Sequence, residues 1–286
     1  MLYSEKLPLF SAAHPCEEIT VGGARFRYIL SGNPERENTR SKALVCLNGG
    51  MNTLEMWMDY ADGLSDAYRV LLFDYPQELR TNQALVAGMH AFFQTLGIEK
   101  PVFVGASDGG MVAQIYVQKY PGETGGLILI STGGMDANTL KSLKRKYFFA
   151  PLMLWYIKHC NYEKLKPRLI KAGMSHIRNE SADEIAYAEN MFVTIFKDFT
   201  QEKDVHISGL LADLMNQTPV TEADFAALAG KILLILPDQD FFSGEMQADL
   251  IRLMHDPQIA YVSGGHLSTV LRADDYIRTI RAFLEQ

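Results

Sequence analysis

Residues 102–110 read Val-Phe-Val-Gly-Ala-Ser-Asp-Gly-Gly, and this stretch decides the fold. The apolar run Val102–Val104 is short and rich in β-branched residues, as a buried parallel strand should be. A helical pattern follows, because the apolar residues between positions 111 and 116 recur at spacings of three and four. The sequence therefore predicts a strand, a tight turn and a helix, with Ser107 at the turn.

The turn itself, Gly105-Ala106-Ser107-Asp108-Gly109, fits the G-x-S-x-G pattern of a nucleophile elbow, which lifts a serine hydroxyl above a parallel sheet. Glycines beside the serine leave room where a Cβ would clash. The serine also lies at a helix N-terminus, where free N–H groups favour a developing negative charge. The alternative is a plain glycine-rich turn of a doubly wound sheet. Only the surrounding sequence can distinguish such a turn from a nucleophile elbow.

Short apolar runs alternate with helical patterns along most of the chain. The runs lack polar alternation, so we interpret them as buried parallel strands, and the strand–helix alternation favours a doubly wound α/β fold. Near the start, Glu18–Val21 and Arg25–Leu30 flank Gly22-Gly23 and predict an antiparallel hairpin. The predicted parallel strands are Leu44–Leu47, Val70–Phe73, Val102–Val104, Leu127–Ile130, Ile232–Leu236 and Ile259–Val262.

The alternation breaks between Met135 and Leu228, where the spacing is helical and no convincing strand occurs. We therefore predict an α/β core made of residues 1–134 and 229–286, with a helical cap of residues 135–228 inserted between core strands. Bulky apolar side chains in the cap suit the wall of an apolar pocket, although any single one can simply pack helix on helix. These residues are Met153, Leu154, Trp155, Tyr156, Met174, Met191, Phe192 and Phe196.

Composition narrows the class of protein. A single α/β core can take 286 residues, and the net charge of −7 argues against broad nucleic-acid binding. No run of like charge stands out.

Three widely spaced cysteines, Cys16, Cys46 and Cys160, form neither a disulfide framework nor a metal knuckle, and Cys46 fits a small core residue. No apolar run is long enough for a signal peptide or a membrane span, so we expect a cytoplasmic protein. A homodimer is left open.

A serine nucleophile needs a base, and the base needs an acid that fixes its tautomer. In such folds these groups follow in the order serine, acid, histidine. The run Ile232–Leu236 leads into Pro237-Asp238-Gln239-Asp240, and Ile259–Val262 leads into Ser263-Gly264-Gly265-His266. Because the carboxyl ends of parallel strands meet at one edge, the sequence predicts that Ser107, an aspartate and His266 lie together.

With these motifs the chain resembles proteins of the α/β-hydrolase fold that carry a helical cap, from about residue 17 onward. The acid of that family often sits in a G-x-x-D pattern, and Pro237-Asp238-Gln239-Asp240 keeps the spacing with proline in place of glycine. The resemblance favours Asp240 over Asp238 as the acid. Asp136 is a third candidate, because some relatives place the acid after the strand that precedes the cap. A loop carboxylate or helix cap is the structural alternative for each.

His266 matches the family position of the catalytic base. The other histidines lie in helical patterns, in the insertion or outside the predicted sheet, and we expect each to have a structural role. They are His14, His90, His159, His176, His206 and His255.

An oxyanion hole needs two backbone N–H donors. One is expected from Asp108, the residue after the nucleophile. The resemblance implies that Gly50, in the turn Asn48-Gly49-Gly50-Met51, supplies the other, with Met51 as the fallback and an ordinary Gly-Gly turn as the alternative. Relatives usually have His-Gly where this chain has Asn48. Backbone donors do not need the imidazole, and Asn48 can hold the loop by side-chain hydrogen bonds.

The resemblance implies a serine hydrolase that cleaves an ester, thioester, lactone or related bond of a small apolar acyl substrate. Ser107 argues against haloalkane dehalogenases and epoxide hydrolases, which use aspartate at that position. No phosphate-binding glycine loop or metal-ligand spacing occurs, so no cofactor and no metal are expected. Two alternatives remain, because fold alone does not choose function. One is a carbon–carbon hydrolase, lyase or acyltransferase that uses the same residues, and the other is a non-catalytic receptor for a small ligand.

Overall fold

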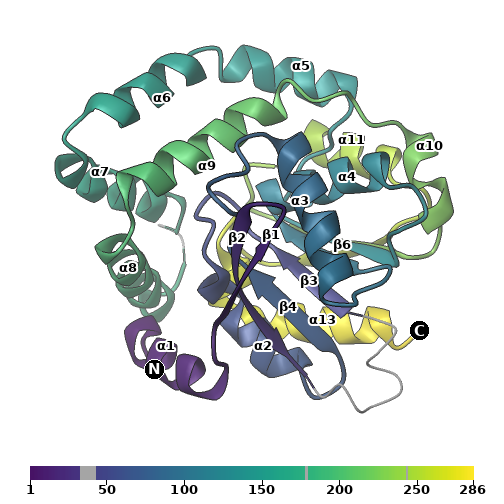
Figure 1. The fold of residues 1–286 in the computed structure, drawn as a ribbon, viewed down its shortest axis with the longest axis horizontal. Helices are drawn as coiled ribbons and strands as arrows, with labels where there is room; N and C mark the ends of the chain where they lie inside the picture. Colours follow the sequence, from purple (N-terminus) through teal and green to yellow (C-terminus); the bar gives the residue numbers. More distant parts are fainter. Residues whose placement is uncertain (33–42, 178–179, 243) are drawn as a thin grey trace.

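A computed structural model describes residues 1–32, 43–177, 180–242 and 244–286 (Figure 1). Its described strands form one sheet in the order β1-β2-β4-β3-β5-β6-β7-β8. The β1–β2 and β2–β4 pairs are antiparallel and every later pair is parallel, which confirms the hairpin and the mostly parallel sheet. The strands are β1 (Glu17–Val21), β2 (Ala24–Ser31), β3 (Ala43–Leu47), β4 (Arg69–Phe73), β5 (Val102–Ala106), β6 (Gly126–Ile130), β7 (Ile232–Pro237) and β8 (Gln258–Val262).

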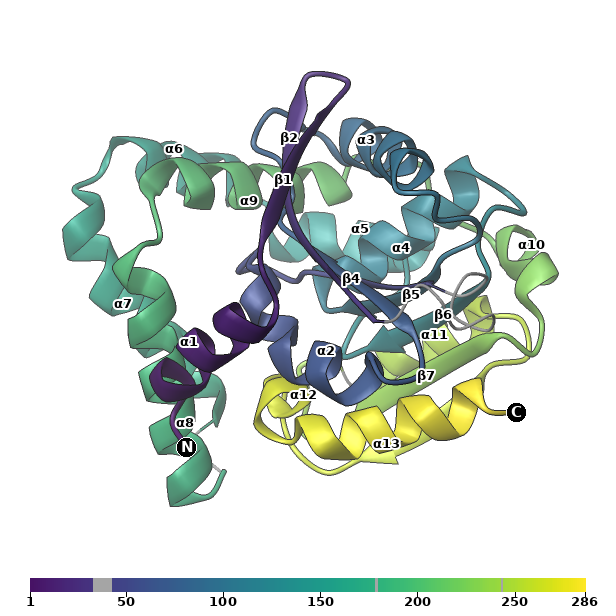
Figure 2. The same ribbon diagram turned by 60° about the horizontal axis from the view of Figure 1, so that its bottom comes forward.

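Helices cover both faces of the sheet, as the doubly wound fold requires (Figures 1 and 2). Strand β3 shows why its run lacks polar residues: Val45 and Leu47 enter the apolar cluster on one face, and Leu44 and Cys46 enter the cluster on the other. Cys46 is thus the core residue expected from its surroundings. The first face carries α3 (Asn82–Thr95), α4 (Asp108–Lys119) and α11 (Glu245–Leu253), and the second carries α2 (Met58–Leu64) and α13 (Ala273–Leu284).

Several helical segments lie between β6 and β7, as the sequence predicted (Figure 1). Helix α6 packs on α9 and α7 packs on α8, and in both views these helices extend beyond one side of the sheet (Figure 2). Their treatment as a separate cap stays a prediction. The segments are α5 (Ala137–Lys146), α6 (Ala150–His159), α7 (Tyr162–Met174), α8 (Ala182–Lys197), α9 (Gln201–Leu214) and α10 (Glu222–Phe225). Short helical turns complete the fold at Leu54–Trp57, Ser175–Ile177, Ala226–Leu228 and, as α12, Ser268–Leu271.

Two features differ from what the sequence suggested. Strand β8 exists, but it is not buried: it is an edge strand, and 39% of Ile259 and 71% of Tyr261 are exposed. The N-terminal residues, which gave no pattern, form helix α1 (Tyr3–Ala13). That helix lies against α8, where the Ser4 N–H donates to Asn190 Oδ1 at 2.8 Å (Figure 2).

In the described ranges no helix is long and apolar enough to cross a membrane. Nor do these residues include a group of three or more His, Cys, Asp or Glu side chains that could hold a metal ion.

Candidate active site

Ser107 joins β5 to α4 in the conformation expected of an elbow. Its backbone has φ 53° and ψ −122°, a left-handed conformation that is strained for any residue with a Cβ. Two hydrogen bonds hold it there: the Ser107 N–H donates to the Ile130 carbonyl at 3.0 Å, and Thr132 Oγ1 donates to the Ser107 carbonyl at 2.6 Å. The predicted strand, turn and helix are confirmed. Hydrogen bonds to neighbouring residues hold the Ser107 backbone in its strained conformation.

The glycines beside Ser107 are required by close packing. A Cβ on Gly105 would lie 2.7 Å from the carbonyl oxygen of Gly109, and a Cβ on Gly109 would lie 2.1 Å from the carbonyl oxygen of Leu47. Neither separation is tolerable for real atoms. The helix that starts at the elbow can therefore press directly against the end of β3.

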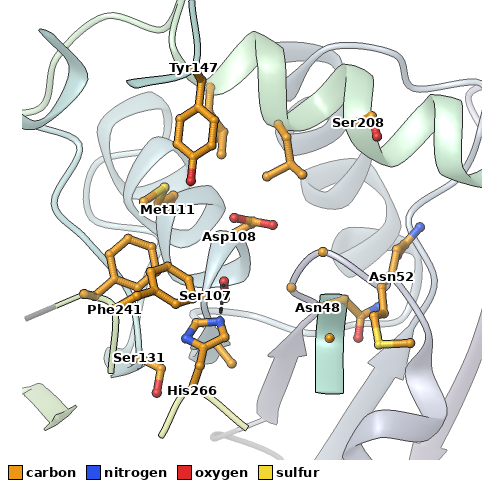
Figure 3. A pocket seen from close by; sticks show the side chains of 18 of the residues that line it. Asn48, Asn52, Ser107, Asp108, Met111, Ser131, Tyr147, Ser208, Phe241 and His266 are labelled. Atoms are coloured by element: carbon orange, nitrogen blue, oxygen red, sulfur yellow. Dashed lines mark hydrogen bonds between the residues drawn. The ribbon is translucent and has the colours of Figure 1, made fainter. Parts of the chain in front are cut away.

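The structure brings Ser107, His266 and Asp240 together. Figure 3 shows the first two of them, joined by a dashed line. The imidazole Nε2 of His266 lies 3.1 Å from Ser107 Oγ, and its Nδ1 lies 2.9 Å from Asp240 Oδ1. Parallel pairing of β7 with β8 sets Pro237 beside Val262, so the loops that carry Asp240 and His266 leave the sheet together. The Asp240 side chain is fully buried, and its Oδ1 also accepts the Phe242 N–H at 3.2 Å.

The other two candidate acids have structural partners. Asp238 Oδ1 accepts the Gly264 N–H at 2.9 Å, so it holds the loop that leads to His266. Asp136 caps α5, with Oδ1 accepting the N–H groups of Asn138 and Thr139. Asp238 thus matches the loop-carboxylate alternative and Asp136 the helix-cap alternative, and no hydrogen bond joins either to His266 within the described residues.

The remaining histidines lie away from Ser107, and none is among the described residues that line the cavity around it. His206, for example, is buried, and its Nε2 lies 2.9 Å from the Leu79 carbonyl. The side chain of His176 lies outside what the structure describes. The other partners are Asp62 for His14, Glu123 for His90, the Trp155 carbonyl for His159 and Glu222 for His255.

The turn after β3 faces the start of α4 across Ser107. Leu47 pairs with Gly105, which sets the turn beside the elbow. A Cβ on Gly49 would lie 3.8 Å from Ser107 Oγ, and a Cβ on Gly50 would lie 3.4 Å from Asp108 Oδ2. Gly49 thus packs against Ser107 and Gly50 lies beside the Asp108 carboxylate, and the roles of Gly50 and Asp108 as oxyanion donors stay predictions.

Asn48 holds this turn by its side chain, as expected. Its Nδ2 donates to the Phe73 carbonyl at 2.7 Å, and its Oδ1 accepts the indole N–H of Trp57 at 3.0 Å. Tyr75 donates its hydroxyl to the Asn48 carbonyl at 2.9 Å. The side chain is 2% exposed and uncharged, so these bonds do not depend on pH as bonds to an imidazole would.

Ser107 opens into a cavity of about 720 Å³ whose lining is mostly apolar. Core loops form one wall, and the helices inserted between β6 and β7 form another. Of the bulky residues expected there, Met153, Leu154 and Phe192 line the cavity, whereas Met191 and Phe196 are buried in the apolar core.

Sequence reasoning missed several aromatic residues of the cavity, among them Phe241 and Tyr147 (Figure 3). The Phe241 ring packs on the His266 imidazole with centroids 4.2 Å apart. Its place directly after Asp240 was a usable signal, because the neighbours of a candidate acid that follows a strand lie at the same sheet edge. Tyr147 follows α5, and nothing in the local pattern distinguishes it from a surface residue.

The Asp108 carboxylate also lines the cavity (Figure 3). Burial disfavours its charged form and raises its pKa to about 6, against the opposing attraction of His266. No hydrogen bond stabilises the carboxylate within the described part of the chain. The cavity therefore holds an acid whose charge is poorly compensated.

The topology, the elbow and the inserted helices define a class, and comparison with known proteins agrees. A profile of the family described as the alpha/beta hydrolase fold matches residues 42–158. The chain therefore has the α/β-hydrolase fold, and the proteins that it resembles are hydrolases.

Individual relatives are more distant. The chain is 24% identical to the proline iminopeptidase PfmaB of Pestalotiopsis fici, over 94% of this chain and 99% of that protein. It is 33% identical to the 2-hydroxy-6-oxononadienedioate/2-hydroxy-6-oxononatrienedioate hydrolase of Comamonas testosteroni, over 40% of this chain and 43% of that one. The enol-lactonase of Burkholderia xenovorans LB400 superposes with a TM-score of 0.72 at 17% identity, covering 94% of this chain and 100% of the enzyme.

Proposed function

We propose that the protein is a serine hydrolase that cleaves an ester, thioester, lactone or related acyl bond through an acyl-enzyme. One observation carries this proposal: Ser107 Oγ lies 3.1 Å from His266 Nε2, whose other ring nitrogen lies 2.9 Å from a buried aspartate. That geometry suits a nucleophile, a base and an orienting acid. The cytoplasmic location and the homodimer remain predictions beside it.

In the first half of the reaction His266 Nε2 takes the proton of Ser107 while Oγ attacks the acyl carbon. Asp240 accepts the Nδ1–H, holds the imidazole in the productive tautomer and stabilises the imidazolium. The backbone N–H groups of Asp108 and Gly50 donate to the oxyanion. His266 then protonates the leaving group, which departs and leaves Ser107 acylated.

In the second half a water molecule attacks the acyl carbon and gives its proton to His266. The tetrahedral intermediate collapses, Ser107 Oγ recovers its proton from His266 and the acid product leaves. The mostly apolar cavity favours an apolar acyl group over a charged one.

The test combines covalent labelling with an activity screen. A fluorophosphonate probe should label Ser107, and Ser107→Ala should abolish labelling and lower kcat on any cleaved ester by a factor on the order of 10⁴. A burst of product from an activated ester indicates an acyl-enzyme. Tight ligand binding with neither burst nor labelling would instead indicate a receptor.

The acid has its own matched pair of variants. Asp240→Asn should lower kcat on the order of 10³-fold or more, because an amide favours the wrong tautomer of His266. Asp238→Asn keeps an oxygen for the Gly264 N–H and should leave most of the activity. A severe loss in Asp238→Asn alone would overturn the assignment.

A second substrate class, an acyl group with a free amine, is favoured by the Asp108 carboxylate in the cavity. An ammonium group close to the scissile carbonyl would compensate that charge. The similarity to a proline iminopeptidase over 94% of the chain points the same way. Comparing an amino-acid ester with its N-acetyl counterpart tests it: preference for the free amine should disappear in Asp108→Asn.

A further inference from the structure

Exposed large apolar side chains gather on one short stretch of the inserted helices. Among the described residues, seven of the fifteen such side chains fall within positions 147–156. Phe148, Phe149 and Leu152 are 74%, 71% and 61% exposed, in a region where folding would normally hide them. We call this set the aromatic face: Tyr147, Phe148, Phe149, Leu152, Met153, Trp155 and Tyr156.

The aromatic face divides into two parts. Tyr147, Phe149 and Met153 line the cavity that holds Ser107. Phe148, Leu152, Trp155 and Tyr156 are not among the described residues that line the cavity. Leu152 and Trp155 are three residues apart, so they lie on one side of α6 and continue the apolar surface outward. An acyl chain can therefore pass from the outer part to the serine without leaving apolar surroundings.

The segment that carries the face is also strongly basic. Residues 137–175 contain nine Lys and Arg and one acidic residue, Glu163, which is a net charge of +8. Because the whole chain carries −7, the rest of it carries −15. Lys144, Arg145 and Lys146 are exposed directly before the face, and no acidic residue lies between Asp136 and Glu163.

This pairing of aromatic side chains with cations fits one partner. Trp, Tyr and Phe partition into the interface of a bilayer, and clustered Lys and Arg are attracted to anionic headgroups. A second copy of the chain that docked through the same face would set +8 against +8, and a nucleic acid has no acyl layer to receive Phe148 and Leu152. In Figure 1, α5 and α6 form an outer rim, remote from α13.

We propose that α5 and α6, through the aromatic face and the cations of α5, dock on an anionic phospholipid bilayer, from which a lipid acyl ester enters the cavity of Ser107. The docking half of this inference stands on the surface alone. The substrate half rests on the proposed function.

Vesicle binding tests the docking half. The protein is sedimented with vesicles of phosphatidylcholine alone or with about one third phosphatidylglycerol. We expect binding to the anionic vesicles, weakened by high salt. The triple variant Phe148→Ser, Leu152→Ser, Trp155→Ser should lose at least about tenfold in partition coefficient, and so should Lys144→Gln, Arg145→Gln, Lys146→Gln. The matched control, Leu9→Ser with Tyr261→Ser, removes exposed apolar residues elsewhere and should bind as the wild type does.

Two results would overturn the docking half: wild-type protein that stays in solution with anionic vesicles, or a Phe148/Leu152/Trp155 variant that binds normally. A wild-type dimer that the same variant converts to monomer, without vesicle binding, would make the face a self-association surface and also overturn it. Circular dichroism and unchanged melting confirm that the variants fold.

Activity separates the two halves. On a short soluble ester the Phe148/Leu152/Trp155 variant should match the wild type within about twofold, since those residues do not line the cavity. On a lipid ester in anionic vesicles it should lose about tenfold or more. Equal loss on both substrates would overturn the substrate half. If the wild type cleaves no soluble ester, the proposed function fails, and vesicle binding still decides the docking.

Discussion

The glycines beside Ser107 pack so closely against backbone atoms that they leave no space for a side chain. The closest approach is at Gly109. A Cβ there would lie 2.1 Å from the Leu47 carbonyl oxygen, which belongs to the backbone of a buried strand and cannot rotate away. Gly109→Ala should therefore destabilise the fold by roughly 3 kcal/mol or more, or displace the turn after β3 and lower kcat about a hundredfold.

Gly209 provides the matched control for that substitution. It lies within α9, and a Cβ there has no atom within 4 Å. Gly209→Ala should raise the melting temperature, because alanine is favoured over glycine in a helix by about 1 kcal/mol. Thermal melts of both variants check the prediction, and it fails if Gly109→Ala is as stable and active as the wild type.

The raised pKa of Asp108 predicts how the stability of the fold depends on pH. This pKa of about 6 lies above the ordinary 3.8, so the folded protein holds this proton more tightly than the unfolded chain does. The stability it contributes should therefore fall as the pH rises through the interval between those two values. Asp108→Asn removes the buried charge and should stabilise the protein by up to about 3 kcal/mol above that interval, and by little below it.

Melting temperatures measured on both sides of the interval check this expectation. The exposed mid-helix variant Glu189→Gln serves as the control, because it should show no such pH-dependent difference. A constant difference between Asp108→Asn and the wild type across the whole range would contradict the reasoning.

At the scale of elements, the loop that carries His266 is tied to α8. The Gly265 N–H donates to Glu180 Oε1 at 3.1 Å, and Arg272, between α12 and α13, bonds to Glu180, to Glu184 and to the Ser263 carbonyl. The segment of the inserted helices thus contacts the loop of His266 directly. Hydrogen bonds from Arg272 and Ser181 lower the pKa of Glu184 to about 2.

Arg272→Met should loosen this connection, so we expect kcat to fall about tenfold with a smaller change in KM, and the melting temperature to drop a few degrees. Arg278→Met, which removes an exposed pair with Asp275 on α13, is the control and should change little. Because the pKa of Glu184 is depressed, its pairing stabilises the fold above the ordinary 4.5 and is lost as the pH falls toward 2. Equal kcat in both variants would contradict a positioning role for Arg272.

The elements also show what the sequence can and cannot predict. Strands such as β3 and β5 were predictable because both faces are buried, so apolar runs appear without polar interruption. Helix α1 was not, because it buries few residues, chiefly Tyr3 and Phe10, and contains Pro8. The candidate site could be assembled because its members directly follow strands. The hydrogen bonds of Asn48 with Trp57 and Tyr75 could not be predicted, because they join residues that come together only when the chain folds.

At the scale of the whole molecule, the uneven charge was hidden from a residue-by-residue view. No long run of like charge exists, and the total of −7 suggests a uniformly acidic surface. The excess of positive charge in residues 137–175 becomes visible only when the inserted helices are counted as a unit. Since the same helices wall the cavity of Ser107, one segment can both attract a surface and choose what enters.

The walls that the inserted helices give to the cavity should select the length of the acyl chain. Leu154 and Leu211 line the cavity from α6 and α9, so each should contact the distal part of a long acyl chain. Leu154→Ala and Leu211→Ala should each shift the ratio of kcat/KM between long and short esters by about 1–3 kcal/mol. Labelling of Ser107 by a small fluorophosphonate should hardly change, because that probe does not reach those walls. Leu152→Ala, on the same helix but outside the lining, should keep the wild-type ratio on soluble esters. If all three variants keep that ratio while still cleaving esters, substrate length is selected by the α/β core, and the inserted helices have no part in it.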